Sequence, residues 1–399
     1  MSLGRRGLES LEPRGGGSNR FSTERLNPVS TVRRRILFLT VMPSPYQREL
    51  FQALHADGRI GVRVLYYTNT AMDRDWTLGP LSACEEILPG RTLRWLGPSA
   101  HLNQGIARLL YNDSSELFVL SDYSALTTQI AMQVLTWRKK RWVFWGEAPG
   151  FSQRKLLGKT VRRQLQRPIA GATAIAAIGS EAADVYRRLF PRIRIFNIPY
   201  FRDLSPFRTA AKARRQRSKN TVDVLFSGQL IERKGVDLLI KAFVQISDEV
   251  PQMRLQLLGS GPALDDLVGM IPGKVRDRIH FLGFQQPDDM PRIFAEADIF
   301  VLPSRHDGWG VVVNEALGAG LPIIVSDHVG ARDLVENGCN GFITDAGQVD
   351  SLASALLKLA RFGALRESFS RSSAQRALQW DVDEGVRRWL ELYEWALNA

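Results

Sequence analysis

The sequence predicts an α/β protein with two domains, each a doubly wound parallel sheet with helices on both faces. The chain has 399 residues, enough for two or three domains that each bury a core. Short apolar runs alternate with helix-like segments over residues 35–201, and the alternation starts again at residue 221. The apolar runs are continuous, which is typical of strands buried on both faces of a parallel sheet.

The first domain, residues 35–201, begins with the apolar run ILFLTVMP, which predicts a strand. A helix is expected over 46–56, where Leu50, Phe51 and Leu54 share one face. A loop region separates the next two strands. Strands are expected at 62–67, 116–122, 141–147 and 174–180, a helix at 124–137 and a basic helical stretch at 153–167. This order is that of a doubly wound domain.

Residues 202–220 are polar and basic and are expected to form an interdomain linker. The second domain, residues 221–379, repeats the alternation. Its strands are expected at 222–228, 253–261, 279–284, 299–304 and 322–327, and its helices at 235–247, 263–271, 289–297 and 311–320.

A helical pair is expected from residue 349 to residue 399, and its last segment, 380–399, should return to the first domain. Four aromatic residues in it have the spacing of one packed helix face: Trp380, Trp389, Tyr393 and Trp395. The C-terminal helices would therefore clasp both domains.

Composition narrows the class of protein. The chain is 44% hydrophobic and 24% charged, which excludes a mainly disordered protein, although the Arg- and Gly-rich residues 1–34 are expected to form a disordered basic tail. Cys84 and Cys339 lie too far apart in the sequence to suggest a disulfide framework or a thiolate metal cluster, which fits a reducing cytoplasm. No apolar run is long enough to span a membrane, and no signal peptide is recognised.

The net charge of +12 is unevenly distributed. Residues 1–200 hold 29 Lys and Arg against 15 Asp and Glu, residues 201–219 hold 7 against 1, and residues 220–399 hold 17 against 25. The basic character therefore belongs to the N-terminal half and the linker. One side of the molecule should suit an anionic polymer or a membrane surface.

Loops at the carboxyl ends of the strands should carry the ligand site, because doubly wound domains bind ligands there. In DGWGVVVNEALGAG, Gly308 and Gly310 flank Trp309 just before an apolar helix, so backbone amides could approach a pyrophosphate. Glu315 lies about one turn into that helix, where its carboxylate could accept hydrogen bonds from ribose hydroxyls. Lys234, in ERKG, would neutralise a leaving diphosphate.

Several segments, taken in order, resemble the GT-B glycosyltransferases of family 4: SGQLIERKGVDLL, LLGSGP, the stretch from FLGFQQPDDM to PIIVSD, and ENGCNGFIT. The resemblance covers residues 221–345. Over 35–200 it is weaker, and MPSPYQREL, WGEAPG, IGSEAADVY and NIPYF are similar to a subgroup of bacterial surface-polysaccharide and lipopolysaccharide assembly. The resemblance implies two Rossmann-like domains facing across a cleft, and transfer of a sugar from a UDP- or GDP-type nucleotide sugar with retention of anomeric configuration.

The resemblance also implies roles for single residues. Asp307 and Glu315 match the family's E-x7-E spacing with Asp in the first position, where the acid contacts hydroxyls of the donor sugar. Gln229 stands where the family commonly has an arginine, and Arg233 is the expected substitute for that charge. The other expected donor-binding residues are Lys234, Gly308, Trp309, Gly310, Val311 and, near the nucleobase pocket, Gly283 and Phe284, of which Phe284 is also interpreted as core.

Glu147, at the end of the strand 141–147, stands where relatives often have a histidine near the reacting centre. Its carboxylate would orient the acceptor hydroxyl, or merely cap the next segment. Its place at a strand's carboxyl end favours the cleft, and Asp122 is a weaker candidate of the same kind. Lys234, Asp307 and Glu147 are thus the predicted catalytic residues.

No metal or other cofactor is expected, because Lys234 and helix amides would supply the positive charge at the diphosphate. Asp73 and Asp75 have the D-x-D form that binds a metal in the other major glycosyltransferase fold, and they remain the alternative.

Residues 153–167 carry six positive charges and no acid. Arg154, Lys155, Arg162 and Arg163 flank an apolar stripe, which predicts a helix lying on a membrane surface, although a solvated helix packed on its sheet is the alternative. The first domain would then bind a sugar or lipid-linked acceptor at the inner face of the cytoplasmic membrane.

Two other functions stay open. An epimerase or hydrolase could use the same fold, because a fold does not determine chemistry. A nucleic-acid-binding protein would also have a basic patch, but no recognisable nucleic-acid-binding module is present and the C-terminal half is acidic.

Overall fold

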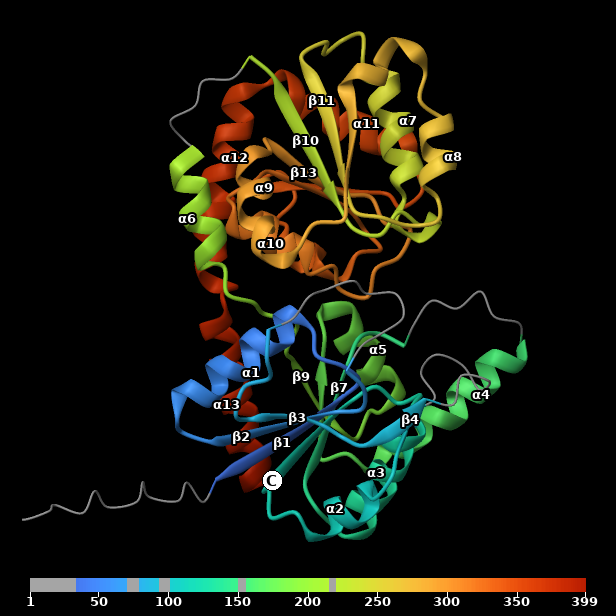
Figure 1. The fold of residues 1–399 in the computed structure, drawn as a ribbon, viewed down its shortest axis with the longest axis vertical. Coiled ribbons are helices and arrows are strands. Elements are labelled where there is room, and N and C mark those ends of the chain that lie inside the picture. The colour runs from blue at the N-terminus through green and yellow to red at the C-terminus, as the bar shows by residue number, and fades with distance from the viewer. Residues whose placement is uncertain (1–33, 70–78, 93–100, 150–155, 215–219) are drawn as a thin grey trace, which may run out of the picture. The chain divides into compact units, whose positions relative to one another are not determined.

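Two parallel sheets organise the chain in the computed structural model (Figure 1). The structure describes residues 34–69, 79–92, 101–149, 156–214 and 220–399. Every pair of neighbouring strands in these two sheets is parallel. The predicted fold class, an α/β protein with two doubly wound sheets, is confirmed.

The first sheet and its helices form the N-terminal lobe. Its strand order is β3-β2-β1-β6-β7-β8-β9. The strands are β1 (Arg35–Thr40), β2 (Gly61–Tyr66), β3 (Glu85–Ile87), β6 (Leu117–Ser121), β7 (Trp142–Gly146), β8 (Ala174–Ala177) and β9 (Arg194–Asn197). The helices are α1 (Pro45–Asp57), α2 (Ile106–Asn112), α3 (Leu126–Trp137), α4 (Leu156–Gln166) and α5 (Ser180–Leu189).

The second sheet forms the C-terminal lobe, with strand order β12-β11-β10-β13-β14-β15. The strands are β10 (Val222–Ser227), β11 (Met253–Leu258), β12 (Ile279–Gly283), β13 (Ile299–Leu302), β14 (Ile323–Ser326) and β15 (Gly341–Thr344). The helices are α6 (Ser205–Arg214), α7 (Val236–Ile246), α8 (Leu264–Gly269), α9 (Met290–Glu296), α10 (Val312–Gly318), α11 (Val349–Arg361) and α12 (Gly363–Arg376).

Each sheet has a point where the strand order reverses. The first strand of the N-terminal lobe, β1, lies between β2 and β6, and β10 lies between β11 and β13. Loops that leave neighbouring strands at such a point diverge to opposite faces and open a crevice at the carboxyl edge. The segments after β1 and after β10 are therefore placed to line ligand sites.

Successive residues of β1 enter different cores. Phe38 packs on the face covered by α1, whereas Leu37 and Leu39 pack on the face covered by α2, α3 and α5. A final helix, α13 (Val382–Asn398), joins α1 on the first of these faces. Its Trp389 ring lies 5.0 Å from Phe38 and 5.2 Å from Trp145, with both pairs edge to face.

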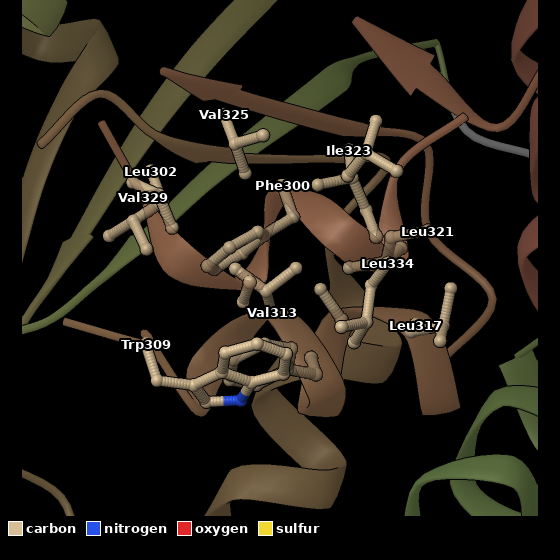
Figure 2. Packing of buried hydrophobic residues seen from close by; sticks show 14 of the residues in the cluster. Phe300, Leu302, Trp309, Val313, Leu317, Leu321, Ile323, Val325, Val329 and Leu334 are labelled. Atoms are coloured by element: carbon tan, nitrogen blue, oxygen red, sulfur yellow. The ribbon is translucent and has the colours of Figure 1, made fainter. Parts of the chain in front are cut away.

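In the C-terminal lobe, α10 is buried between the sheet and its neighbours. Figure 2 shows Val313 and Leu317 of this helix among Phe300, Ile323 and other apolar side chains of the strands. Almost every residue of α10 is buried, so this short helix is held by packing on all sides. The side chains of α10, including Glu315, are therefore fixed in position.

Three parts of the chain differ in detail from the expectations. The loop region before residue 116 holds β3, the helix α2 and an antiparallel pair, β4 (Gly90–Thr92) and β5 (His101–Asn103). These strands have only three residues each, too few to show a period. The C-terminal helical pair is three helices, α11, α12 and α13, because the backbone at Phe362 is extended and a short 3₁₀ turn with Trp380 separates the last two.

The stretch 202–220, expected as a linker, contains helix α6, which packs on α9. Phe207 is fully buried there, with its ring 5.7 Å from that of Phe294. The described part of this stretch is thus a folded element of the C-terminal lobe. The tail 1–34 lies outside the described residues except for Arg34. Among the helices described, none is both long and apolar enough to cross a membrane.

Candidate active site

Loops of both lobes surround a hollow of about 480 Å³, called here the interlobe hollow. It is lined by residues that follow β1, β7 and β9 on one side and β10, β11, β12 and β13 on the other. Most of the predicted site residues line it: Glu147, Gln229, Arg233, Lys234, Phe284, Asp307, Trp309, Gly310, Val311 and Glu315. A larger hollow of about 640 Å³ is lined by none of them.

Lys234 and Asp307 form an ion pair in the interlobe hollow. Lys234 ends a 3₁₀ turn before α7, and its Nζ donates to Asp307 Oδ2 at 2.5 Å. Both side chains are nearly buried, with 12% and 11% exposed. A charged pair at this depth is well oriented, because few rotamers remain open to it.

Arg233 adds a second positive charge beside this pair. Its Nη1 donates to the His306 carbonyl at 2.9 Å and lies 3.7 Å from Asp307 Oδ1. Its side chain stays 43% exposed, so the guanidinium can turn toward a ligand. Gln229, which follows β10, lines the same hollow. Arg233 therefore places a positive charge in the same hollow as Gln229.

Glu315 is buried, and only one of its two carboxylate oxygens has a hydrogen-bond partner. One carboxylate oxygen, Oε1, accepts a hydrogen bond from Arg202 Nη1, while Oε2 is buried with no hydrogen-bond partner. Burial raises the pKa of Glu315, although Arg202 opposes the rise. A buried carboxylate oxygen without a hydrogen-bond partner lowers the stability of the fold. A hydrogen-bond donor on a ligand would therefore be stabilised at this oxygen.

Arg202 was missed in the sequence because it lies in a stretch that was interpreted as a linker. Its guanidinium bridges Glu315 of α10 and Glu49 of α1, donating to Glu49 Oε1 at 2.8 Å. Burial lowers the pKa of Arg202, but the two carboxylates more than compensate and raise it overall. The only sequence signal was a charged residue directly after the apolar segment that ends in Phe201.

Glu147 follows β7 and reaches the C-terminal lobe. A Cβ added at Gly308 would lie 1.8 Å from Glu147 Oε2, so the Glu147 carboxylate packs closely on the Gly308 backbone and would have to shift for any larger residue there. The Tyr186 hydroxyl donates to the Glu147 carbonyl at 2.7 Å and holds its backbone in place. Glu147 thus lines the interlobe hollow together with Asp307.

The electrostatic setting of Glu147 is unusual. Burial raises the pKa of Glu147 to about 7, and the nearby Asp307 carboxylate adds to the rise. Arg233, Lys234 and a hydrogen bond from the Tyr200 hydroxyl oppose it. A carboxyl group that titrates near neutral pH can exchange a proton under physiological conditions.

Other predicted residues have different settings. The Trp309 side chain, shown in Figure 2, is 1% exposed. Its Nε1 donates to Asn314 Oδ1 at 2.9 Å. Its indole is therefore a packing group, with the Trp380 ring 6.4 Å away and Gly179 close to its edge. Gly310, with φ +92°, makes the turn into α10. Gly283 does not line the hollow, and its carbonyl accepts from the Gly259 amide.

Phe284 is half-buried at the wall of the interlobe hollow, next to Gln285. A flat aromatic face in this position is suited to a nucleobase, so the interpretation as core describes only part of its surface. Loops with small residues lie beside it: Gly228, Gly259, Ser260 and Gly261. These small residues leave room for a ligand close to the backbone.

The remaining predictions concern a different surface. Arg162 and Arg163 are on α4 and line neither hollow described so far, whereas Arg154 and Lys155 lie outside the described residues. Asp73 and Asp75 also lie outside them. Asp122 caps its own turn, accepting hydrogen bonds from the amides of Ser124 and Ala125. No group of metal-ligating residues is found in the part of the chain that the structure describes.

The architecture defines the class of protein: two doubly wound lobes with an anion-compatible hollow between them are a GT-B fold. Solved structures agree. Anabaena HepE in complex with UDP superposes with a TM-score of 0.69 at 18% identity, covering 90% of this chain and 99% of that one.

Sequence comparison shows which proteins the chain is similar to. Residues 207–376 match the family model described as glycosyl transferases group 1. This match covers less than half of the chain, and the curated proteins that are similar to the chain include glycosyltransferases.

Two curated relatives illustrate the range of this similarity. The α-D-kanosaminyltransferase of Streptomyces kanamyceticus is 27% identical over 215 residues, which are 51% of this chain and 55% of that protein. The GDP-mannose-dependent α-(1-6)-phosphatidylinositol monomannoside mannosyltransferase of Mycobacterium tuberculosis is 29% identical over 212 residues, which are 50% of this chain and 55% of that protein. The chain thus spans about half the length of these relatives.

Proposed function

We propose that this protein is a retaining glycosyltransferase of family 4 that moves a sugar from a UDP- or GDP-type nucleotide sugar to a sugar or lipid-linked acceptor. The observation that carries the proposal is the unpartnered, buried Oε2 of Glu315. It lies in the same hollow as the cations Arg233 and Lys234 and the acid Asp307. A nucleotide sugar offers the matching groups, namely ribose hydroxyls, a diphosphate and sugar hydroxyls.

The donor would fill the hollow in one orientation. Its ribose diol donates to Glu315 Oε2, which satisfies the buried oxygen. Its base lies against Phe284, and its diphosphate lies near Arg233 and Lys234. The amides of Val313, Asn314 and Glu315 already donate to Gly310 or Val311 in the first turn of α10, so side-chain cations supply most of the positive charge.

The chemical step breaks the bond between the anomeric carbon and the diphosphate oxygen. Arg233 and Lys234 stabilise the negative charge that develops on the leaving diphosphate. Asp307, held by Lys234, accepts from donor-sugar hydroxyls. The acceptor oxygen bonds to the same face of the anomeric carbon, and its proton passes to the leaving phosphate oxygen.

Glu147 is proposed to orient the acceptor hydroxyl. It lies against Gly308 and is within the influence of Asp307, Arg233 and Lys234, so it borders the place where the anomeric carbon would lie. In its ionised form it accepts a hydrogen bond from the hydroxyl and directs the oxygen lone pair toward the donor.

The donor class also has support from a neighbouring fold, since the HepE structure was solved with UDP. No divalent metal is needed in this proposal, because Arg233 and Lys234 carry the charge at the diphosphate. Strict dependence of activity on an added divalent metal would instead favour Asp73 and Asp75 as a metal-binding pair.

Nucleotide release from a panel of UDP-, GDP-, dTDP- and ADP-sugars, with and without candidate acceptors, tests the proposal. Release that requires an acceptor and yields a glycosylated product supports it. Release of free sugar without any acceptor would indicate a hydrolase, and conversion of the sugar nucleotide into its epimer would indicate an epimerase.

We further propose that the enzyme works in cell-surface polysaccharide or glycolipid synthesis at the inner face of the cytoplasmic membrane. Trp137, at the end of α3, is 73% exposed and lies 6.3 Å from the exposed Tyr111 ring, over which the Arg138 guanidinium stacks. Exposed aromatic rings beside basic side chains are typical of the membrane interface. Val161 of α4 is also 57% exposed, near the basic Arg163.

A further inference from the structure

A second hollow, of about 390 Å³, opens from the other side of Glu147 and is called here the N-lobe hollow. Its walls come from the segments that follow β1, β6 and β7. Glu147, Tyr46 and Tyr200 line both this hollow and the interlobe hollow. A molecule in the N-lobe hollow would therefore reach the reacting centre past Glu147.

Aromatic rings form much of its wall. Tyr46 and Tyr200 are half-buried, with ring centres 4.9 Å apart and planes tilted by 57°. Tyr123 is half-buried as well, and its ring lies 6.1 Å from the Phe144 ring. Unlike Tyr46 and Tyr200, Tyr123 lines the N-lobe hollow but not the interlobe hollow. The face of a pyranose ring exposes C–H groups, which pack well on such rings, while its hydroxyls need polar partners.

The polar groups of the N-lobe hollow suit hydroxyls. Thr40, Ser44 and Ser121 contribute hydroxyl groups and Gln47 contributes an amide. The charged residues that line it are Asp122 and Glu147, and no Lys or Arg is among its described lining residues. The cations whose charges act on Glu147 are Arg233 and Lys234, and they line the interlobe hollow instead.

Asp122 is fixed in a strained backbone conformation. Its φ is +91°, uncommon for a residue with a side chain, and its carboxylate accepts from Ser124 Oγ at 2.6 Å and from the Ala125 amide at 2.8 Å. The negative charge therefore cannot turn away from an incoming ligand. A phosphate or carboxylate in this hollow would face two acids, and the described residues that line it include no cation to compensate.

We propose that the N-lobe hollow binds a neutral sugar ring of the acceptor, and that Asp122 and Glu147 exclude acceptors whose reacting unit carries a phosphate or a carboxylate. This inference rests on the proposed function, because Glu147 joins the two hollows. Any charged or lipid part of the acceptor must lie outside the hollow. The aromatic walls hold the ring, and the acids select by charge.

Saturation-transfer NMR tests the proposal with pairs of ligands that differ in one charge. The ligands are the methyl glycosides of glucose, galactose and mannose and their matched uronic acids, each measured with UDP and with GDP at saturation. We expect at least one neutral glycoside to bind about tenfold or more tightly than its uronic acid. Tyr123→Ala should weaken this binding about tenfold, whereas Tyr123→Phe should retain most of it.

A charge variant separates selection from packing. In Asp122→Asn with Glu147→Gln, the uronic acids should approach the affinity of their neutral partners, and Asn tolerates the positive φ at residue 122. Trp137→Ala, outside the hollow, should leave binding unchanged.

Two results would overturn this inference alone. Equal binding of a uronic acid and its neutral partner by the unsubstituted protein would overturn the inference, and so would binding of neither while UDP or GDP still binds. Failure of all nucleotides to bind would overturn the proposed function together with it.

Discussion

Arg202 and Glu315 form a buried ion pair that connects the segment after β9 to helix α10. The same guanidinium also binds Glu49 of α1, so two carboxylates share one positive charge in a carboxylate–guanidinium–carboxylate bridge. The bridge leaves one Glu315 oxygen for a ligand. Arg202 opposes the rise in the pKa of Glu315 that burial causes, and it fixes the orientation of the carboxylate.

Replacing this arginine should affect donor binding more than chemistry. In Arg202→Met, burial without a counter-charge should leave Glu315 protonated, and removing one partner of a buried pair should lower the free energy of unfolding by about 3–5 kcal/mol. We expect KM for the donor to rise about tenfold or more, with kcat nearly unchanged.

Nucleotide analogues distinguish this role from a loss of stability. The unsubstituted protein should bind UDP more tightly than 2′-deoxy-UDP, and Arg202→Met should lose most of that preference, whereas Arg202→Lys should keep part of it. A folded Arg202→Met protein with the original preference would show that Arg202 does not act through Glu315.

Lys234 should be essential for transfer. Lys234→Ala should lower kcat by about a hundredfold or more, the loss typical of removing one preorganised electrostatic group, as measured by nucleotide release with acceptor present. Lys241→Ala is the matched control, because Lys241 is exposed on α7 and lines no described hollow. Full activity in a folded Lys234→Ala protein would contradict its assignment.

The raised pKa of Glu147 links stability to pH. Its pKa in the unfolded chain is near 4.5, and burial raises it to about 7 in the folded protein. The folded state therefore loses stability as pH rises from about 4.5 through about 7, by an amount on the order of 3 kcal/mol.

Glu147→Gln should remove that loss. The variant should gain stability relative to the original protein at pH 8 and not at pH 4.5, as measured by urea unfolding at both pH values. If the difference in stability between the two proteins were the same at both pH values, the Glu147 carboxyl group would not be ionising within a buried site. Transfer activity of the unsubstituted protein should rise through about pH 7, because only the ionised carboxylate accepts from the acceptor hydroxyl.

The stereochemical outcome tests the mechanism independently. Retention is expected because the leaving phosphate receives the acceptor proton on the same face. NMR of the first-formed product would show the anomer directly. An inverted product would exclude family 4 for this protein. It would indicate instead that Glu147 is the general base for attack from the opposite face.

Membrane binding should depend on the basic and aromatic surface of the N-terminal lobe. Arg162→Gln and Arg163→Gln combined with Trp137→Ala should weaken binding to anionic vesicles by about tenfold at low salt, while transfer to a soluble acceptor stays nearly unchanged. Salt should weaken the electrostatic part of binding by the unsubstituted protein. Arg292→Gln with Arg361→Gln, on the acidic lobe, is the matched control, and equal vesicle binding by all three proteins would contradict the proposal.

Sequence reasoning was strongest where a strand or helix had a clear period. The strand of Phe38 and the helix of Leu50 were predicted because buried parallel strands and amphipathic helices leave continuous and periodic apolar patterns. Short strands such as β4 leave none. Arg202 and Tyr200 were missed as site residues because their partners, Glu315 and Glu147, are distant in sequence, and only the folded chain brings them together.

Helix α13 gives the folding of this chain a particular order in time. Its Trp389 and Tyr393 complete the core around Phe38, a residue of the first strand. During synthesis on a ribosome, the part of this apolar face that α13 covers therefore stays exposed until the C-terminal lobe has been synthesised, although α1 covers the rest of the face earlier. A nascent chain of this kind is exposed to aggregation and chaperone binding for most of its synthesis, and a fusion or truncation at α13 would damage the lobe that was translated first.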